Sequence, residues 1–453
     1  MGELKPYPEY KDSEVPSLGN IPAHWQMIRS GYLFREVVDT GHSELELLSI
    51  DRFRGIIRQS DIGRKERASK DRSSYKRIRN GQLGYNLMNA FNGSIGISQY
   101  DGIISPAYAV GQPQKEMIAD YYHHLYRSPI YAAEINRYSY GIMYERNRLY
   151  YDYFKKIPVP YPPIEEQRKI VAVIHQKNRE FQNLISVKRC RIKLLNEQKQ
   201  VIIRRTVTRG LDPNVRLKPS GIEWLRDVPE HWQIQKLKYV TKMIVGGSTP
   251  STTDLSCWNG DIVWITPEDV SKSELLTTSS RKITQNGVKN CSTVIVPKGS
   301  IIITSRAPVG NVAVADIDLC TNQGCKSIIP DLLKFDTSYG YFLLKIMQLE
   351  LQNMSKGTTF YEISTFSLAN VKIPLPPLKE QQIIVESLKK ELDVIENSIK
   401  HTVHEIDLVR EYRTRLISDI VTGKVDLRRI NISDDKPLDQ KTIDTDGITK
   451  MSI

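Results

Sequence analysis

The chain has 453 residues, of which 40% are hydrophobic and 8% aromatic, and this composition indicates an ordered protein of about three domains rather than a disordered one. The formal net charge of +12 favours a polyanionic partner, although charge by itself fits DNA, RNA or a membrane surface. The sequence has no apolar run near the roughly 20 residues of a membrane span, no amino-terminal signal stretch and no CxxC pair, so we expect a cytoplasmic protein with reduced thiols and no membrane partner.

In chain order, the most informative feature is an internal repeat. Residues 11–26 return without gaps as residues 218–233, and both copies end in His-Trp-Gln. Residues 157–167 and 373–381 form a second pair, rich in proline and ending in Glu-Gln. Such a duplication predicts two similar modules with a pseudo-two-fold relation, which suits a target with two halves such as duplex DNA.

Short β-branched and aromatic runs, separated by Gly, Asn, Asp and Pro, fill the first part of each half. The runs 45–50 and 102–110, and in the second half 261–265 and 294–304, predict strands. The proline-rich segments are followed by acidic residues, which is favourable chemistry for the first turn of a helix. We therefore expect a mixed α/β (α+β) fold in which two strand-rich domains alternate with two long helices.

The two predicted helices share one hydrophobic register. Apolar residues recur every 3.5 residues over about four heptads, at positions 214 residues apart in the two helices, as is typical of a coiled-coil seam. Gly210 and Gly423 are expected to end the helices. The predicted seam consists of Ile174, Phe181, Ile185, Ile192 and Leu195 in the first helix and of Leu388, Leu392, Ile395, Ile399, Ile406, Val409 and Leu416 in the second.

Three seam positions of the first helix are polar: Asn178, Lys188 and Lys199. One interpretation is that these residues control the register and favour an antiparallel pair over self-association. The other is an imperfect seam in which the lysines extend toward solvent. The sequence leaves both open.

The segment from residue 52 to residue 79 is the most cationic part of the chain. Such segments bind phosphates because each neutralised phosphate releases counterions, and arginine also reads guanine with two hydrogen bonds. The alternative is a solvated basic loop. In the second half, polar loops that carry glycine take the place of the basic segment, and hydroxyl, amide and guanidinium groups on such loops suit base reading. These loops are residues 246–251, 258–264, 304–310, 321–324 and 356–361.

The sequence carries no recognisable catalytic signature. It has no GxxxxGK[ST] phosphate loop, no strand-coupled GxGxxG and no adenine-methyltransferase tetrapeptide. His401 and His404 lack an evident third metal ligand, so a solvated helix face is expected there. His123 and His124 are expected in a loop or at the surface. We therefore expect no catalytic residue, no metal site and no cofactor bound by this chain.

Taken together, these features resemble the specificity (S) subunit of type I restriction–modification systems. The resemblance covers nearly the whole chain in the family's order and leaves out only the short acidic tail. It rests on residues 218–232, 247–251, 258–260, 356–359 and 372–381 in the second half and on residues 93–108 and 162–167 in the first.

The resemblance implies a non-catalytic recognition subunit. Two target-recognition domains each read one half of a bipartite double-stranded DNA site, and the helices form an antiparallel coiled coil that sets the spacing. Two methyltransferase (M) subunits would bind S-adenosylmethionine, and restriction (R) subunits would use ATP and Mg²⁺. The first domain lacks a counterpart of residues 247–251 and 258–260. The two half-sites should therefore differ, which makes the target asymmetric.

On this basis we divide the chain into five parts: recognition domain 1 (1–162), helix 1 (163–210), recognition domain 2 (211–376), helix 2 (377–427) and a disordered tail (428–453). DNA contacts are expected in both domains. They are Arg52, Arg54, Arg58, Arg64, Lys65 and Arg67 in the first and Ser248, Thr249, Arg306, Thr358, Thr359 and Tyr361 in the second.

Two rival functions stay open at this point. One keeps the fold but places the chain in a type IIB or methylation-only defence system, and neighbouring genes would separate it from type I. The other is a non-catalytic coiled-coil adaptor that binds DNA without sequence preference. Competition with random DNA would reveal the adaptor.

Overall fold

The protein is described by a computed structural model, and it forms two compact units. Unit 1 contains Met1–Lys188 and His404–Ile453, and unit 2 contains Arg189–Val403. The structure describes residues 5–52, 54–62, 71–141, 147–306, 308–354 and 362–430.

Unit 1 is built around a four-stranded antiparallel sheet with the strand order β4-β11-β8-β9. Helices α2 and α3 pack on an aromatic core that includes Trp25, Phe34, Tyr85 and Tyr126, all fully buried. The elements of this unit are β1 (Tyr10–Asp12), β2 (Asn20–Pro22), β3 (Gln26–Arg29), α1 (Ser30–Leu33), β4 (Phe34–Glu36), β5 (Leu48–Asp51), β6 (Gly55–Arg58), β7 (Lys76–Ile78), β8 (Leu83–Asn86), β9 (Ile95–Ile97), β10 (Gly102–Ile104), β11 (Tyr108–Pro113), α2 (Ala119–Tyr126), α3 (Pro129–Arg137), α4 (Tyr151–Phe154) and β12 (Pro158–Tyr161).

Unit 2 contains a five-stranded sheet, β16-β23-β20-β21-β18, and a three-stranded sheet, β19-β17-β22. Its largest core cluster includes Trp232, Phe335 and Tyr339. The elements are β13 (Leu217–Pro219), β14 (Asp227–Pro229), β15 (Gln233–Lys236), β16 (Thr241–Gly246), β17 (Trp258–Ile265), α6 (Pro267–Lys272), β18 (Leu275–Leu276), β19 (Lys282–Ile283), α7 (Gln285–Lys289), β20 (Ile301–Thr304), β21 (Val312–Ala315), β22 (Cys320–Thr321), β23 (Cys325–Pro330), α8 (Thr337–Ile346), α9 (Gln348–Met354), α10 (Thr365–Ala369) and β24 (Lys372–Leu375).

The two repeated sequence segments meet as paired strands in both units. In unit 1, β3 pairs with β12 and Gln26 lies opposite Tyr161. In unit 2, β15 pairs with β24 and Gln233 lies opposite Leu375. The same register therefore joins the start of each half to the segment that precedes its long helix.

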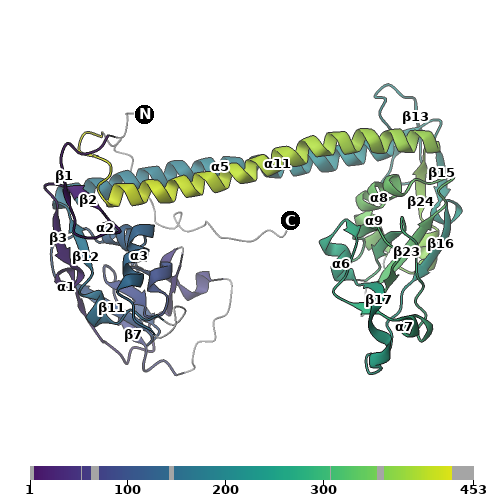
Figure 1. Cartoon of the computed structure of the whole chain (residues 1–453). Coiled ribbons are helices and arrows are strands. Elements are labelled where there is room, and N and C mark those ends of the chain that lie inside the picture. Colours follow the sequence, from purple (N-terminus) through teal and green to yellow (C-terminus); the bar gives the residue numbers. More distant parts are fainter. Residues whose placement is uncertain are drawn as a thin grey trace. The chain divides into compact units, whose positions relative to one another are not determined.

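Two long helices, α5 (Ile164–Arg209, 46 residues) and α11 (Leu378–Val421, 44 residues), pack side by side (Figure 1). Acidic residues occupy their first turns, as the helix dipole favours. Gly210 and Gly423 follow with φ of 74° and 75°, the left-handed conformation that commonly ends a helix. The predicted mixed fold with two long paired helices is confirmed.

Every predicted seam residue is buried or half-buried in the structure. Apolar residues outside that register, such as Val187 and Val394, are 67% and 70% exposed. The 3.5-residue period therefore coincides with the contact surface between the helices.

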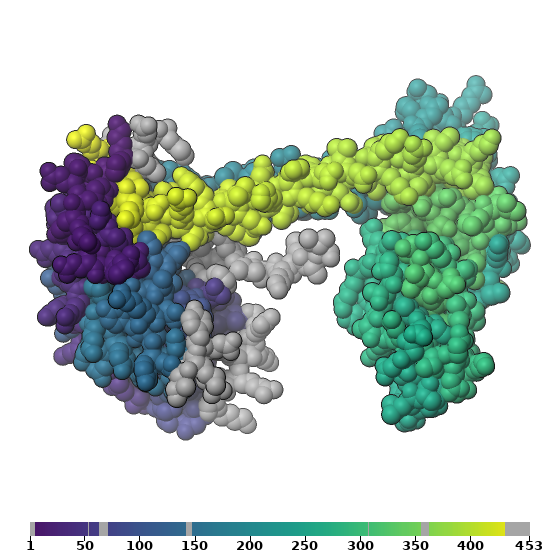
Figure 2. Space-filling model, in the orientation of Figure 1, coloured from purple at the N-terminus to yellow at the C-terminus, as the bar shows by residue number. Residues whose placement is uncertain are grey.

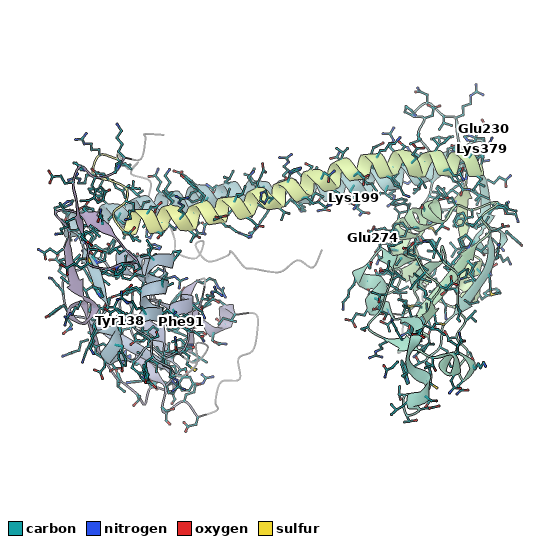
Figure 3. The ribbon with its side chains drawn as sticks, viewed as in Figure 1. Phe91, Tyr138, Lys199, Glu230, Glu274 and Lys379 are labelled. Carbon is teal, nitrogen blue, oxygen red and sulfur yellow. The ribbon has the colours of Figure 1, made fainter. Side chains whose placement is uncertain are left out.

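The polar seam residues bind partners on the opposite helix. The Nε of Arg413 donates to Oδ1 of Asn178 over 2.8 Å. Lys188 Nζ lies 2.7 Å from Glu405 Oε2, and Lys199 Nζ, labelled in Figure 3, lies 2.6 Å from Glu396 Oε1. As the residue number rises on α5 it falls on α11, so the pairing is antiparallel. These contacts favour the register interpretation over lysines that only reach solvent.

Two predicted strands differ from the structure. The run 102–110 divides into β10 and β11, and the run 294–304 forms a strand only at β20. A turn in which Ser300 N–H donates to the Pro297 carbonyl over 3.1 Å interrupts the second run, and Val296 keeps one isolated bridge to Leu319. Within the residues that the structure describes, no helix is long and apolar enough to cross a membrane.

Candidate nucleic-acid interface

The interface begins with the frame that holds each domain on its helices. In unit 1, His24 Nε2 and Trp25 Nε1 both donate to Oε2 of Glu166, over 2.9 and 3.0 Å. The Tyr7 hydroxyl donates to the other carboxylate oxygen. Glu166 lies in the first turn of α5 and is buried. A buried carboxylate with three donors fixes the start of the helix against the entry strand.

Unit 2 repeats this arrangement. His231 Nε2 donates to Oε2 of Glu380 over 2.8 Å, and Trp232 Nε1 donates to Oε1 over 3.0 Å. Glu380 lies in the first turn of α11. We call each set of His, Trp and Glu, together with the glycine described next, a frame joint.

Each frame joint also receives the end of the other long helix. Gly423 follows α11, and a Cβ added to it would lie 2.9 Å from the Trp25 ring and 2.5 Å from Pro22. Gly210 follows α5, and a Cβ there would lie 3.4 Å from both Trp232 and Glu380. Glycine is needed at both positions because φ is positive and, at Gly423, because no side-chain space is left.

The glutamines that follow the joint glutamates bind backbone inside each domain. The side chain of Gln167 accepts from the N–H of Ile118 over 2.9 Å and donates to the Pro162 carbonyl over 2.8 Å. Gln381 accepts from the N–H of Asp336 over 2.8 Å and donates to the Pro376 carbonyl over 2.9 Å. Both are fully buried. The repeated Glu-Gln pair thus serves the frame rather than a catalytic site.

In unit 1, the β5–β6 hairpin carries three of the predicted DNA contacts. Arg52 is exposed at its turn. The backbone N–H of Arg54 donates to Asp51 Oδ1 over 2.8 Å, which closes the turn. Arg58 lies 3.3 Å from Glu46 and stacks over the Tyr100 ring at 5.1 Å. Arg58 is therefore partly neutralised within the domain, and Arg52 is exposed at the hairpin turn.

Arg127, at the end of α2, clamps this hairpin turn. Its Nη1 donates to the carbonyls of Gly93 and Ile95 over 2.9 and 3.1 Å, and its Nη2 donates to the Arg52 carbonyl over 3.1 Å. The guanidinium therefore ties the sheet to the turn that presents Arg52. Nothing in the sequence pattern around Arg127 predicted this role, because its partners are backbone carbonyls distant in the chain.

In unit 2, the structure brings two of the predicted polar loops together. The N–H of Ser248 donates to the Thr321 carbonyl over 3.1 Å, and the Thr249 hydroxyl donates to Gln323 Oε1. Between these loops, a Cβ on Gly247 would lie 2.1 Å from the Thr321 carbonyl oxygen. Glycine is required at 247 because the two backbones nearly touch. Gln323, which is exposed, was not among the predicted contacts.

Arg306 lies beside this loop pair and is tied to an acid. Its Nε donates to Glu362 Oε2 over 2.9 Å, and Lys326 Nζ donates to Glu362 Oε1 over 3.3 Å. Burial alone would raise the pKa of Glu362, but the bonds from the two cations outweigh it and lower the pKa, so the carboxylate stays charged. Glu362 and Lys326 were also missed by sequence reasoning, since neither lies in a recognisable motif.

The remaining predicted contacts, Arg64, Lys65, Arg67, Thr358, Thr359 and Tyr361, lie outside the described residues, as does most of the tail that we expected to be disordered. His401 and His404 lie on an exposed face of α11. The expectation for His123 and His124 was wrong. They lie on α2, half-buried, and the Nδ1 of His123 accepts from the N–H of Ile97 over 3.2 Å. Among the described residues, no group of three His, Cys, Asp or Glu side chains is placed to hold a metal ion.

Residues 229–405 match the family described as the type I restriction modification DNA specificity domain. The chain is 44% identical over 176 residues to the MjaIX type I restriction enzyme specificity subunit of Methanocaldococcus jannaschii, covering 38% of this chain and 40% of the relative. It is 29% identical over 284 residues to the EcoR124I/EcoR124II specificity subunit of Escherichia coli, covering 58% of this chain and 63% of the relative. The matches thus span less than two thirds of either relative.

Two solved structures share the fold. A chain from a structure on complex assembly and conformational transition of the type I R-M system has a TM-score of 0.63 at 18% identity, covering 89% of this chain and 99% of that one. The HsdS subunit from Thermoanaerobacter tengcongensis has a TM-score of 0.50 at 20% identity, covering 89% and 97%. The family match over residues 229–405 and the related subunits thus make this chain similar to type I restriction–modification specificity subunits, and the solved structures show that it shares their fold.

Proposed function

We propose that this chain is the non-catalytic DNA-recognition subunit of a type I restriction–modification complex, and that it reads an asymmetric, bipartite double-stranded site. The observation that carries the proposal is the contrast between frame and surface. The two frame joints match residue for residue, whereas the surfaces mounted on them differ. Unit 1 presents a basic hairpin, and unit 2 presents paired hydroxyl and amide loops.

The contact chemistry supports a division of labour between the two surfaces. Arg52 on a clamped turn suits a phosphate or a guanine, because arginine binds either with two hydrogen bonds. Ser248, Thr249 and Gln323 suit base edges, since hydroxyl and amide groups both donate and accept. Of the predicted contacts in the described residues, we propose Arg52, Arg54, Arg58, Ser248, Thr249 and Arg306 as DNA contacts.

The long helices are the proposed docking site for two methyltransferase subunits. Their faces outside the seam carry exposed apolar side chains, and a bound partner would remove these side chains from contact with water. In the view of Figure 2, the side of α11 that faces the reader, coloured yellow to green, is open along most of its length. These side chains are Leu184, Val187, Leu194 and Val201 on α5 and Ile383, Val394, Leu408 and Tyr412 on α11.

In this proposal the partners supply the chemistry. Methyltransferase subunits would bind S-adenosylmethionine and methylate adenine N6, and restriction subunits would use ATP and Mg²⁺. The names of the related subunits, all of type I enzymes, favour this system over a type IIB or methylation-only one.

The decisive experiment is single-molecule methylome sequencing of cells with and without the gene. A two-part, non-palindromic N6-methyladenine motif should disappear on deletion and return on complementation. An unchanged methylome would contradict the proposed function. Retention of the motif alone, with no cleavage of unmodified DNA by the purified complex, would identify a methylation-only system.

A further inference from the structure

Glu362 lies between two cations at the recognition surface of unit 2. Its Oε2 accepts from Arg306 Nε over 2.9 Å, and its Oε1 accepts from Lys326 Nζ over 3.3 Å. The Lys326 side chain is only 12% exposed, whereas that of Arg306 is 45% exposed. Glu362 is therefore bound on one oxygen by a largely buried lysine and on the other by a more exposed arginine.

The backbone around this group is tied together from three segments. Ser305 N–H donates to the Gly324 carbonyl over 2.8 Å, and Ile363 N–H donates to the Ser305 carbonyl over 3.0 Å. Arg306 and Glu362 form an isolated antiparallel bridge. The backbones of Arg306 and Glu362 are thus held side by side, which places the guanidinium within reach of the carboxylate.

The bond to Glu362 uses the Nε–H of Arg306 and leaves the two terminal nitrogens of the guanidinium for another ligand. A guanidinium has five N–H donors in one plane, and four of them are on the two terminal nitrogens. Within the part of the chain that the structure describes, those nitrogens of Arg306 bond to no other group. Guanine presents two acceptors, O6 and N7, at the spacing that such a pair of donors matches.

We propose that Glu362 is a specificity-determining positioning residue, which orients Arg306 to read a guanine in the half-site of the second domain. The inference rests on the proposed function, since it assigns one base of the DNA site. Glu362 is not itself the reader, because both of its carboxylate oxygens are already bound to cations. We do not assign Lys326 as a phosphate contact, because its side chain is only 12% exposed and its Nζ lies 3.3 Å from where a Cβ on Gly246, its partner across strands β16 and β23, would be.

The inference differs from a phosphate role for Arg306 in a measurable way. A phosphate contact adds affinity for every sequence, so its loss weakens binding uniformly. A positioned guanine reader adds affinity for one base at one position. Its loss therefore changes the recognition motif at that position and leaves the other half-site unchanged.

The test replaces Glu362 by Gln in the chromosomal gene and reads the methylome of the resulting strain. Glutamine keeps the size of the side chain but removes the charge that holds Arg306 and Lys326. We expect methylation at sites that carry another base in place of one guanine, with discrimination at that position falling roughly tenfold, and no change in the other half-site. Asp316→Asn is the matched control, because it breaks the ion pair with Lys298, 2.7 Å long, in the same unit.

Each result decides the question. The absence of a bipartite methylation motif from the unaltered strain would contradict the proposed function itself. A bipartite motif that is identical in the unaltered strain and in Glu362→Gln would overturn the inference while leaving the proposed function intact. Relaxation at one guanine in Glu362→Gln, with no relaxation in Asp316→Asn, would support it.

If Glu362→Gln abolishes methylation altogether, Arg306→Lys decides instead. Lysine keeps the positive charge beside Glu362 but lacks the two-pronged donor. Relaxation at a single guanine in Arg306→Lys supports guanine reading. An unchanged motif, or a uniform loss of methylation at all sites, contradicts it.

Discussion

Tyr121 donates its hydroxyl to the backbone carbonyl of Val421, 300 residues later in the chain, over 2.8 Å. In unit 2, the Tyr339 hydroxyl donates to the carbonyl of Val207 over 3.0 Å. Both acceptors lie at the carboxyl end of a long helix, where carbonyls have no partner within the helix. The carboxyl end of α11 therefore packs in the core of unit 1, and the carboxyl end of α5 packs in the core of unit 2.

The first prediction concerns the frame joint of unit 2. Glu380→Gln should lower the free energy of unfolding by about 1.5–3 kcal/mol, because the charged acceptor for His231 and Trp232 is lost. Thermal or urea unfolding of the full chain measures the change. Glu386→Gln, on an exposed face of the same helix and paired with Lys390, should change stability much less, because exposed ion pairs contribute little. Equal effects of the two variants would show that the joint contributes nothing beyond a surface ion pair.

A second prediction separates backbone strain from crowding at Gly423. Gly423→Ala should destabilise the protein by about 1–2 kcal/mol through its positive φ and by about 1–3 kcal/mol more through contact with Pro22 and Trp25. Gly41→Ala has a similar positive φ with nothing within 4 Å of the added Cβ, so it should show only the first part. Unfolding midpoints in urea give both values. A Gly423→Ala variant no less stable than Gly41→Ala would rule out the tight packing described for the joint.

The third prediction addresses the seam. Replacing both Asn178 and Arg413 by Leu should raise the free energy of unfolding by about 1–4 kcal/mol, because a well-packed apolar pair often stabilises a protein more than a largely buried polar pair does. The same change should increase self-association in light scattering, because the apolar seam no longer selects one antiparallel register. Thr402→Val is the control, since that hydroxyl bonds to Ser398 of its own helix. A double variant with the same oligomeric state as Thr402→Val would place register control elsewhere.

Arg127 provides a fourth prediction, at the hairpin turn of unit 1. Arg127→Ala removes donors to three carbonyls and should loosen the turn that carries Arg52. We expect degenerate methylation in one half-site only, measured from the methylome of the variant strain. Arg137→Ala, at a 61% exposed side chain near Glu134, should leave the motif unchanged. Degeneracy in both half-sites would point to global loosening rather than to this turn.

The fifth prediction concerns acid. Burial, followed by the charges of His175, Arg127 and Arg413, lowers the pKa of His124 from its ordinary 6.5 to about 3. Between about pH 6.5 and pH 3, the unfolded chain therefore binds a proton at His124 that the folded chain does not. The free energy of unfolding decreases as the pH falls through this range. Urea unfolding at pH 7 and pH 5 should show a loss of stability that is smaller in His124→Gln. An equal loss in the variant would assign the acid sensitivity to other groups.

The frame was predictable from the sequence because its signals are local or periodic. The His-Trp entries, the first-turn glutamates and the seam register are visible as repeats, and the structure uses each of them. The antiparallel orientation was not fixed by the period, since a 3.5-residue repeat fits either direction. The partners Glu396 and Glu405 decide it.

The recognition surfaces were only partly predictable, because their contacts join distant loops. The loops at 246–251 and 321–324 were identified, but not that they touch. Glu362 and Arg127 carried no signal, since an isolated acid or arginine is typical of any surface. Their importance comes from long-range pairing that composition and spacing do not encode.

The frame joints use residues that are separate from the hairpin and loops that face the proposed DNA. His231, Trp232, Glu380 and Gly210 interact with one another and with helix ends, whereas Thr249, Gln323 and Arg306 belong to a different surface of unit 2. Substitutions in the loops therefore leave the folding and assembly contacts of the domain in place. A lineage is free to acquire a new base preference in one half-site by loop divergence alone, while the rest of the molecule stays under unchanged selection.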